Sequence, residues 1–282
     1  MSDEPEALMS RRAMVRTVGA GAFAAALGIA VSHPQRVLAT ELGSETSPSF
    51  VLRPEERAVF FDVGGTILDW SVMPEKLTNF FLERGLRVDG VEFWPAWRTK
   101  LFFYMMYNSL IDSGFIPLEE LGRRTTLAVT GAMGIDLDRA DAGDILPLLG
   151  ELDLYPDVLP GLERMQEAGF RMIPHTQLSQ NIVERALLHR FDWDWYFTSE
   201  TFAVYKPHRS IYLRAFEALG LDPSQVIYVT SNQFDVFGAK GAGVRAAWVD
   251  RWDEPLEPYG YVPDWQVGNF EELADLIATG ER

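Results

Sequence analysis

The amino-acid sequence predicts an α/β fold in which a parallel β-sheet is covered by helices on both faces and a helical segment is inserted after the first strand. Three observations support this prediction. An apolar strand ends at Asp62 and is followed by two glycines. Residues 74–152 then show helical spacing of apolar residues without a good strand. From Asp157 onward, apolar strands alternate with helices, which is typical of a parallel sheet.

Composition and charge exclude several classes of function. The chain has 282 residues, 47% of them hydrophobic, which is enough for one or two domains. Its net charge of −16 disfavours binding to nucleic acid or to anionic membranes, so an anionic substrate needs a local positive site. The chain lacks cysteine, and its four histidines are too scattered for metal-ligand spacing. We therefore expect no metal, cofactor or thiol nucleophile.

Residues 1–39 are expected to be an export signal rather than part of the fold. The pair Arg11-Arg12 precedes a Gly/Ala-rich apolar run over residues 18–31, and residues 37–39 form a small-residue cleavage site. This arrangement resembles a twin-arginine signal, which implies passage through the twin-arginine export machinery to the periplasm. The alternatives are an uncleaved N-terminal anchor in the inner membrane and a misassigned start codon.

The remaining elements are justified in chain order. Residues 40–50 are polar and lack apolar periodicity, so they are predicted to be a flexible leader. A core is predicted over residues 51–72 and 156–282, with a helical cap over residues 73–155. Within the second part of the core, Gly169 is expected to end a helix. The strands predicted after it are Phe170–Pro174, a strand around Phe197, Gln225–Thr230 and Val244–Val249.

Asp62 is the first candidate for chemistry. It ends the strand Phe60-Phe61, and ligands of open α/β sheets bind at the carboxyl ends of strands. A carboxylate at this place can attack an electrophile. The sequence Asp-x-Gly-Gly also serves as an ordinary turn, so Asp62 alone leaves both interpretations open.

Polar residues follow the strands in a characteristic order. They are Asp62 and Thr66, then Thr176 and Gln177, then Lys206, and finally Asn232 and Asp235. A nucleophilic Asp, a hydroxyl, a Lys and a late Asp in this order resemble the haloacid dehalogenase superfamily. The resemblance implies a Rossmann-like, doubly wound parallel sheet, with a helical cap inserted after the first strand.

Two positions discriminate between phosphatases and dehalogenases within that superfamily. Magnesium prefers several carboxylate oxygens, and the phosphatases supply one of them from an Asp in the fourth loop. The matching residue in this chain is Ser231. The Asp that the phosphatases use as a general acid, two residues after the nucleophile, is replaced by Gly64. Both losses argue against a metal-assisted phosphatase.

Three further motifs are similar to those of the L-2-haloacid dehalogenases. The fourth loop of those enzymes reads Ser-Asn-x-aromatic-Asp, as in Ser231-Asn232-Gln233-Phe234-Asp235. Their third motif has Lys with Tyr six residues later, as in Lys206 and Tyr212. Their cap has Trp-Arg-x-Lys, as in Trp97-Arg98-Thr99-Lys100. The resemblance implies hydrolysis of carbon–halogen bonds in short 2-haloalkanoic acids, and a homodimer.

The resemblance also implies a role for each residue. Asp62 would displace the halide and form an ester. Lys206 would keep that carboxylate ionised and attract the substrate, and Thr66 and Thr176 would orient Asp62 and the substrate carboxylate. Asp235 would activate water as a general base.

The remaining roles concern the halide and the support of the charged residues. Arg98 would stabilise the departing halide. The other expected halide contacts are Gln177, Asn232 and Phe234. Tyr212 and Thr230 would hold Lys206 and Asp235 in place.

Alternative interpretations remain for these residues. Lys206 could be solvated, Arg98 could extend over an apolar helix face, and His175 is more typical of a buried core residue than of a catalyst. The dehalogenases usually have Tyr at the position of Gly64, so a larger or wetter pocket is expected there. The alternative functions are a phosphatase with an unusual metal site and a non-catalytic protein that binds small acids.

Overall fold

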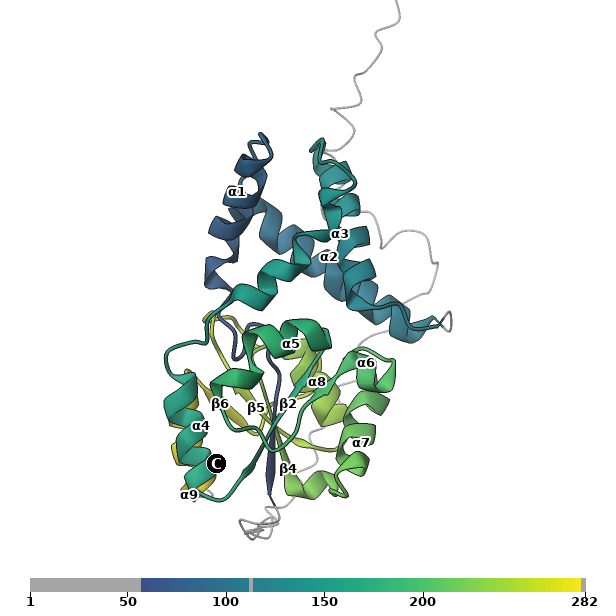
Figure 1. Cartoon of the computed structure of the whole chain (residues 1–282). Coiled ribbons are helices and arrows are strands. Elements are labelled where there is room, and N and C mark those ends of the chain that lie inside the picture. The colour runs from purple at the N-terminus through teal and green to yellow at the C-terminus, as the bar shows by residue number, and fades with distance from the viewer. Residues whose placement is uncertain (1–56, 112–113, 280–282) are drawn as a thin grey trace, which may run out of the picture. The chain divides into compact units, whose positions relative to one another are not determined.

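The protein folds around a parallel sheet of six strands in the order β3-β2-β1-β4-β5-β6, as shown by the computed structural model, which describes residues 57–111 and 114–279 (Figure 1). The strands are β1 (Ala58–Phe61), β2 (Arg171–Thr176), β3 (Phe197–Thr198), β4 (Val226–Thr230), β5 (Arg245–Val249) and β6 (Trp265–Val267). The predicted strands are present, and β6 is an addition that the sequence analysis did not identify. The expected signal and leader lie outside the described residues.

Helices connect these strands. They are α1 (Met73–Glu83), α2 (Gly90–Leu110), α3 (Leu118–Met133), α4 (Val158–Glu167), α5 (Gln180–Ala186), α6 (Ser199–Phe202), α7 (Arg209–Ala218), α8 (Gln233–Gly241) and α9 (Phe270–Thr279). Short 3₁₀ helices fill other connections: η2 (Trp70–Val72), η3 (Asp141–Gly143), η4 (Leu146–Glu151), η5 (Leu188–Arg190) and η6 (Pro223–Gln225). Among the described residues, no helix is long and apolar enough to cross a membrane.

Strand β1 shows why both faces of the sheet are covered. Its side chains alternate, so Val59 and Phe61 pack into one apolar cluster, together with α4 and α9. Ala58 and Phe60 pack into a second cluster, which includes apolar side chains of α7 and α8. The sheet is therefore doubly wound, which confirms the predicted fold class.

The order of strands places three loops next to each other. Phe61, the last residue of β1, pairs with Pro174 of β2 on one side and with Val229 of β4 on the other. β1 thus lies between β2 and β4, and the connections at this point run to opposite sides of β1. In open α/β sheets such a switch point forms a crevice for ligands. The residues that follow β1, β2 and β4 therefore meet at one edge of the sheet.

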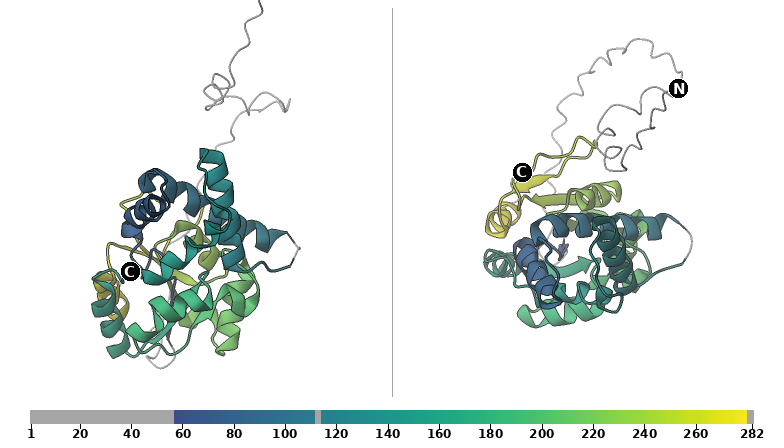
Figure 2. Two further views of the ribbon diagram at one scale, coloured as in Figure 1. Left: turned by 45° about the horizontal axis from the view of Figure 1, so that its top comes forward. Right: turned by 90° about the horizontal axis from the view of Figure 1, so that it is seen from above.

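Helices α1, α2 and α3 lie together beyond the carboxyl ends of the strands (Figures 1 and 2). The side chain of Asp89 accepts a hydrogen bond from the backbone of Val91 and so caps the start of α2. Helix α3 ends at Gly134, which has the left-handed φ of 69° that favours glycine. All three helices lie between β1 and β2, where the helical insertion was predicted, and the proposed boundaries at residues 73 and 155 stay a prediction.

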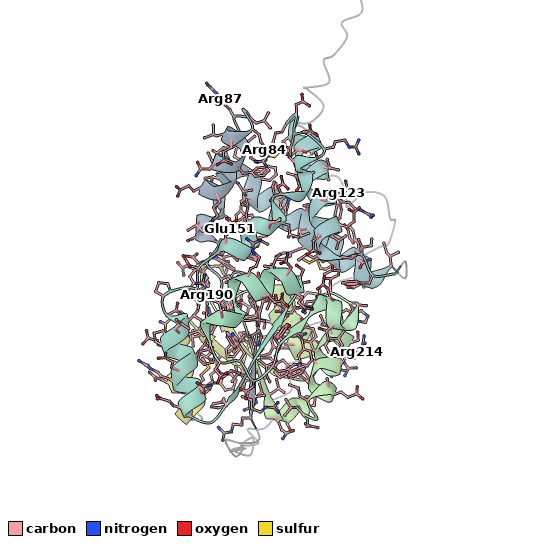
Figure 3. The ribbon with its side chains drawn as sticks, in the orientation of Figure 1. Arg84, Arg87, Arg123, Glu151, Arg190 and Arg214 are labelled. Carbon is pink, nitrogen blue, oxygen red and sulfur yellow. The ribbon has the colours of Figure 1, made fainter. Side chains whose placement is uncertain are left out.

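Ion pairs connect the segment that follows these helices to α1 and to the core (Figure 3). Glu151 lies 3.3 Å from Lys76 of α1 and 3.8 Å from Arg185 of α5. Asp153 pairs with Arg190 at 3.0 Å. Because these side chains are at least partly exposed to solvent, each pair contributes only about 0–1 kcal/mol. The pairs therefore place little energetic restraint on a movement of the cap helices against the core.

Candidate active site

Asp62 directly follows β1 and is held by its own turn. Its backbone N–H donates to the carbonyl of Val229, which extends the strand pairing by one residue. The hydroxyl of Thr66 donates to Asp62 Oδ2 at 3.0 Å and accepts from the backbone N–H of Ser231 at 2.8 Å. Gly65 has a φ of 75°, which allows the tight turn between Asp62 and Thr66. The carboxylate is therefore fixed, with 5% of the residue exposed.

A buried ammonium group lies between two carboxylates. Lys206 Nζ is 2.9 Å from Asp62 Oδ1 and 2.8 Å from Asp235 Oδ2, and Lys206 is completely buried. The hydroxyl of Tyr212 donates to Asp235 Oδ1. A buried charge is tolerated only when it is paired and hydrogen-bonded, as it is here. The interpretation of Lys206 as a solvated surface residue is therefore wrong.

The cluster shifts the pKa values of two of its members. Burial raises the pKa of Asp235 to about 6, against the opposing effect of Lys206, and the charge of Asp62 adds to the increase. Burial alone would lower the pKa of Lys206, but the charges of Asp235 and Asp62 and their hydrogen bonds outweigh it and raise that pKa. At neutral pH Lys206 is therefore protonated, and Asp235, with a pKa of about 6, is mostly ionised.

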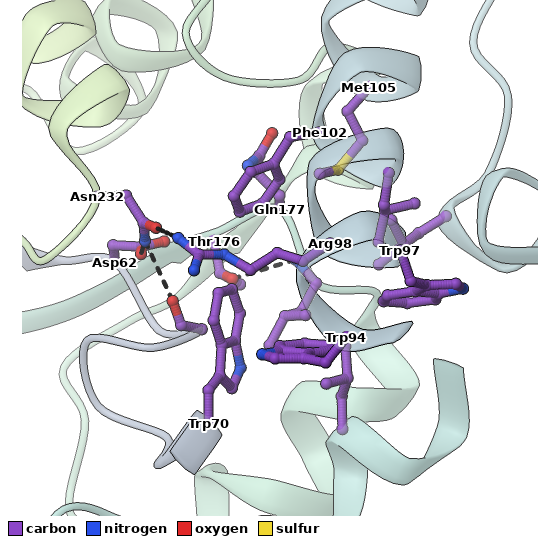
Figure 4. Close-up of a pocket in the computed structure, with 15 residues that line it drawn as sticks. Asp62, Trp70, Trp94, Trp97, Arg98, Phe102, Met105, Thr176, Gln177 and Asn232 are labelled. Carbon is purple, nitrogen blue, oxygen red and sulfur yellow. Dashed lines mark hydrogen bonds between the residues drawn. The ribbon is translucent and has the colours of Figure 1, made fainter. Parts of the chain in front are cut away.

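Asn232 connects the nucleophile to the cap. Its Nδ2 donates to Asp62 Oδ2 at 2.8 Å and to the carbonyl of Gly64 at 3.2 Å, whereas its Oδ1 accepts from Arg98 Nη2 at 3.3 Å (Figure 4). Arg98 extends from α2 of the cap toward the core, as expected. Arg98 therefore brings a positive charge from the cap to the side of Asp62, and it does not simply lie over an apolar helix face.

Three aromatic rings surround the guanidinium of Arg98. Its Cζ lies 5.1 Å from the ring centre of Trp70, 5.4 Å from that of Phe102 and 5.0 Å from that of Trp252. Burial lowers the pKa of Arg98, and the nearby charge of Glu254 opposes this shift, but a guanidinium stays protonated in proteins. The partly desolvated cation is thus available to an anion in the pocket.

A small pocket lies between the cap and the core. It has a volume of about 30 Å³. Its polar lining is formed by Asp62, Arg98, Thr176, Gln177 and Asn232, and its apolar lining by Trp70, Trp94, Trp97, Leu101, Phe102, Met105, Leu118, Leu149 and Leu178. The pocket therefore combines an ionic end at the nucleophile with an apolar end formed largely by the cap.

Two polar groups in this pocket have free hydrogen-bonding capacity. The hydroxyl of Thr176 accepts from the backbone N–H of Leu178 at 3.1 Å, which leaves its own proton to donate. Gln177 Oε1 is buried and has no hydrogen-bond partner among the described residues. Both groups can contact a polar ligand beside Asp62.

The match to known proteins agrees with this geometry. A model of the haloacid dehalogenase-like hydrolases matches residues 56–243. The chain belongs to the haloacid dehalogenase-like hydrolases. It is 24% identical over 226 residues to an (S)-2-haloacid dehalogenase of Pseudomonas sp. (strain YL), covering 79% of this chain and 95% of that protein.

Two further relatives are similar over comparable lengths. The hydrolase is 28% identical over 229 residues to (S)-2-haloacid dehalogenase 4A of Burkholderia cepacia, covering 79% of this chain and 95% of that protein. A crystal structure of a dehalogenase with an intermediate complex is 25% identical and covers 79% of this chain and 97% of its own, with a TM-score of 0.70. The relatives therefore span both the core and the cap of the hydrolase.

Three residues that were predicted to assist binding are not part of the pocket lining of this hydrolase. Tyr212 lies behind the cluster and contacts Asp235, as expected for a supporting residue. The hydroxyl of Thr230 accepts from the backbone of Asn232 at 3.0 Å, so it supports Asn232 rather than Lys206 or Asp235. The ring of Phe234 lies 5.0 Å from that of Phe102. The halide contact of Phe234 and the supporting roles of Tyr212 and Thr230 in catalysis stay predictions.

The expectation of a larger or wetter pocket at Gly64 is wrong. The indole of Trp70 fills the space, because a Cβ built on Gly64 would overlap Trp70 Cζ2 and lie 3.2 Å from Cε2 and Cη2. A Cβ on Gly65 would lie 2.8 Å from Trp70 Cε3. The indole of the hydrolase is thus packed against both glycines of the turn that follows the nucleophile.

His175 is a buried residue behind the cluster, as the sequence suggested. It is completely buried, and its Nδ1 lies 2.9 Å from the hydroxyl of Tyr228. Burial lowers the pKa of His175 well below its ordinary value, and the charge of Lys206 acts in the same direction. His175 is therefore neutral at physiological pH, and the structure places it outside the pocket lining.

Three residues that shape the site were not among the predicted ones. Trp70, the first residue of η2, and Trp252, in the segment after β5, contact Arg98 from the core. Arg251 donates to the carbonyl of Thr66 at 3.0 Å and pairs with Asp157 at 2.8 Å, so it holds the turn of the nucleophile. The positions of Arg251 and Trp252 directly after the strand Val244–Val249 could have indicated them, because that strand end faces the same edge.

Ser231 is one of the two positions that distinguish phosphatases from dehalogenases in the sequence. Ser231 Oγ is buried without a hydrogen-bond partner among the described residues. Within residues 57–111 and 114–279, no group of three or more His, Cys, Asp or Glu side chains is arranged to hold a metal ion. Whether the hydrolase works without a metal stays a prediction.

Proposed function

We propose that this protein is a metal-independent dehalogenase of short 2-haloalkanoic acids. The observation that carries the proposal is the buried cluster of Asp62, Lys206 and Asp235, with Arg98 of the cap hydrogen-bonded to Asn232, which donates to the other carboxylate oxygen of Asp62. The similarity to (S)-2-haloacid dehalogenases over most of the chain supports the same reaction.

In the first step, a carboxylate oxygen of Asp62 attacks C2 of the substrate. The new bond joins this oxygen to C2 while the carbon–halogen bond breaks, and the halide leaves with the bonding electron pair. Lys206 donates to Asp62 Oδ1 and holds the attacking carboxyl group in place, and Arg98 stabilises the negative charge that develops on the halide. Thr176 donates to the substrate carboxylate. The attack is in line with the leaving halide, so the configuration at C2 is inverted.

In the second step, water hydrolyses the ester. The water oxygen attacks Cγ of Asp62 while one of its protons passes to Asp235. The bond between Cγ and the substrate oxygen then breaks, this oxygen takes the proton back from Asp235, and the remaining water proton leaves the Asp62 carboxyl group for the solvent. The product is a 2-hydroxy acid, and the carboxylate of Asp62 is restored. Overall, one haloacid and one water give one hydroxy acid, one halide and one proton.

Halide release in the presence of EDTA tests the proposal. We expect the full-length protein to release halide from L-2-chloropropionate and bromoacetate at the same rate with EDTA as with added magnesium, and to convert L-2-chloropropionate into D-lactate. Absence of halide would refute the dehalogenase proposal, and hydrolysis of an aryl phosphate that requires magnesium would support the phosphatase instead.

Asp235→Asn is expected to trap the ester. Because Asp62 and Arg98 remain, the first step proceeds once, whereas hydrolysis slows by about 10²–10⁴-fold without the general base. Rapid mixing should show a burst of one halide per chain, and mass spectrometry should show the added carboxyalkyl group of the substrate as an ester on the peptide of Asp62. A burst-free, wild-type rate would contradict the role of Asp235.

Turnover should depend on pH through the same carboxylate. The pKa of Asp235 is raised to about 6, so Asp235 is deprotonated and able to accept a proton above that pH, and it is protonated below it. We expect kcat to fall about tenfold per pH unit well below pH 6, since a protonated carboxylic acid cannot act as base. Steady-state measurements between pH 4.5 and 8.5 check this. A kcat that stays constant down to pH 5 would contradict it.

We also propose that the protein is exported to the periplasm by the twin-arginine route. The proposal is supported by Arg11-Arg12 and the apolar run that follows them, which lie outside the described residues. Fractionation of cells that express the full chain should find the shortened protein in the periplasm. Replacing both arginines with lysine should retain the precursor inside the cell.

The resemblance to the L-2-haloacid dehalogenases also leads us to propose a homodimer, which light scattering can test.

A further inference from the structure

The turn after Asp62 and the side chain of Trp70 depend on each other. Gly64 does not have a left-handed φ, so its backbone could accept a side chain. The space into which that side chain would extend is occupied by the indole of Trp70. The indole of Trp70 can thus occupy this place because position 64 has no side chain.

The same indole faces the substrate pocket. Trp70 lines the pocket together with Asp62 and Arg98 (Figure 4). Its ring packs edge-on against Trp94 of the cap, with a distance of 5.5 Å between the centroids and an angle of 85° between the planes. Trp70 therefore forms a wall between the ionic end of the pocket and the apolar surface of the cap.

The indole nitrogen supplies a second, independent observation. Trp70 is 7% exposed, and its Nε1 is buried without a hydrogen-bond partner among the described residues. A buried N–H group is normally satisfied, because leaving it unpaired costs free energy. In this pocket, a polar atom of a bound ligand is a suitable acceptor.

We infer that Trp70 is a specificity-determining residue that contacts the substrate, limits the size of its C2 substituent and takes the place of a side chain at position 64. The inference rests on the proposed function, because the substituent is defined for a 2-haloacid bound at Asp62. Trp70 also supports Arg98 through the contact of its ring with the guanidinium.

The coupling between the two positions can be tested without enzyme activity. In urea unfolding, Gly64→Ala should lower the midpoint, since the new methyl group overlaps the indole. In a Trp70→Ala background, the same Gly64→Ala change should lower it little or not at all. Gly131→Ala is the matched control, because no atom lies within 4 Å of the place that its new methyl group would take. Equal midpoint shifts from Gly64→Ala in both backgrounds would overturn the inference.

The limit on substrate size is tested with bromoacetate and the 2-bromo derivatives of propionate, butyrate and hexanoate. We expect Trp70→Ala to raise the ratio of kcat/KM for 2-bromohexanoate over 2-bromopropionate by at least about tenfold, because one methylene in a tight pocket already changes discrimination by about 10–200-fold. Trp70→Phe keeps a ring, so its ratio should stay near that of the wild type, whereas its KM should rise as the N–H is lost. An unchanged ratio in Trp70→Ala would overturn the inference.

A failure of the proposed function would be recognised separately. If no 2-bromo acid releases bromide, the same comparison is made by calorimetric binding of propionate, butyrate and hexanoate. A preference of Trp70→Ala for hexanoate, together with non-additive unfolding midpoints, would support the role of Trp70 while refuting the dehalogenase reaction. No shift in chain-length preference would refute the role of Trp70.

Discussion

Replacing Asp62 with asparagine is expected to reduce halide release by about 10⁶-fold, the size of effect seen when an enzyme loses its nucleophile. The carboxylate is the only group of the pocket lining that is both anionic and directly hydrogen-bonded to Lys206 among the described residues. An amide has the same size but is a poor nucleophile, so the ester cannot form. The measurement is the initial rate of halide release from L-2-chloropropionate, with thermal unfolding as a check of the fold.

An isotope experiment separates nucleophilic attack by Asp62 from direct attack by water. In a single turnover in ¹⁸O-labelled water, the label should enter the carboxylate of Asp62, because water attacks Cγ of the ester. Asp153→Asn is a suitable control, because Asp153 is an exposed partner of Arg190 outside the pocket. Label found only in the hydroxy acid would show that water attacks C2 directly.

Lys206→Met is expected to have the largest effect on stability. Met has a similar length but no charge, so Asp62 and Asp235 would face each other in a buried site without the ammonium between them. Removing one partner of a buried ion pair costs about 3–5 kcal/mol of unfolding free energy. The activity should fall by about 10²–10³-fold, as it does when one preorganised electrostatic contact is removed.

The loss of stability should itself depend on pH. Without Lys206, the like charges raise the pKa of Asp235 further above its ordinary value, so protonation at low pH relieves the repulsion. Urea unfolding should therefore show a smaller loss at pH 5 than at pH 8. Lys240→Met is the control, because Lys240 forms a partly exposed pair with Asp264 at 2.7 Å, and such pairs contribute about 0–1 kcal/mol. Equal losses of unfolding free energy in Lys206→Met and Lys240→Met would contradict the expectation that a buried ion pair matters more than a partly exposed one.

Most of the fold could be predicted because its signals are local. Apolar runs such as Phe170–Pro174 and Val244–Val249 are read directly as buried strands, and Gly169 marks the end of a helix. The strand β6 (Trp265–Val267) was not identified, because it follows a segment rich in proline, glycine and acidic residues, and its pairing with β5 forms only in the folded chain. The edge strand β3 (Phe197–Thr198) is shorter still, but its place between two predicted helices indicated it.

Part of the candidate site could also be predicted from local signals in the sequence. The order of Asp62, Lys206 and Asp235 along the chain is visible in the sequence, because each follows a predicted strand. Their distances are not visible, since they depend on the order of the strands in the sheet. The roles of Trp70 and Trp252 were missed because a single aromatic residue carries no local signal for the distant side chain that it contacts.

Gly64 illustrates the difference between what the sequence determines and what only the folded structure determines. The amino-acid sequence alone established that no side chain follows Val63 at this position, and that a nucleophile, a cation and a second carboxylate occur in the order of a dehalogenase. The folded structure was needed to find that Trp70 fills the vacant space and that Arg98 extends from the cap onto Asn232. Residue types and spacing specify local backbone and chemistry, whereas the filling of a pocket depends on contacts between segments that meet only in the folded chain.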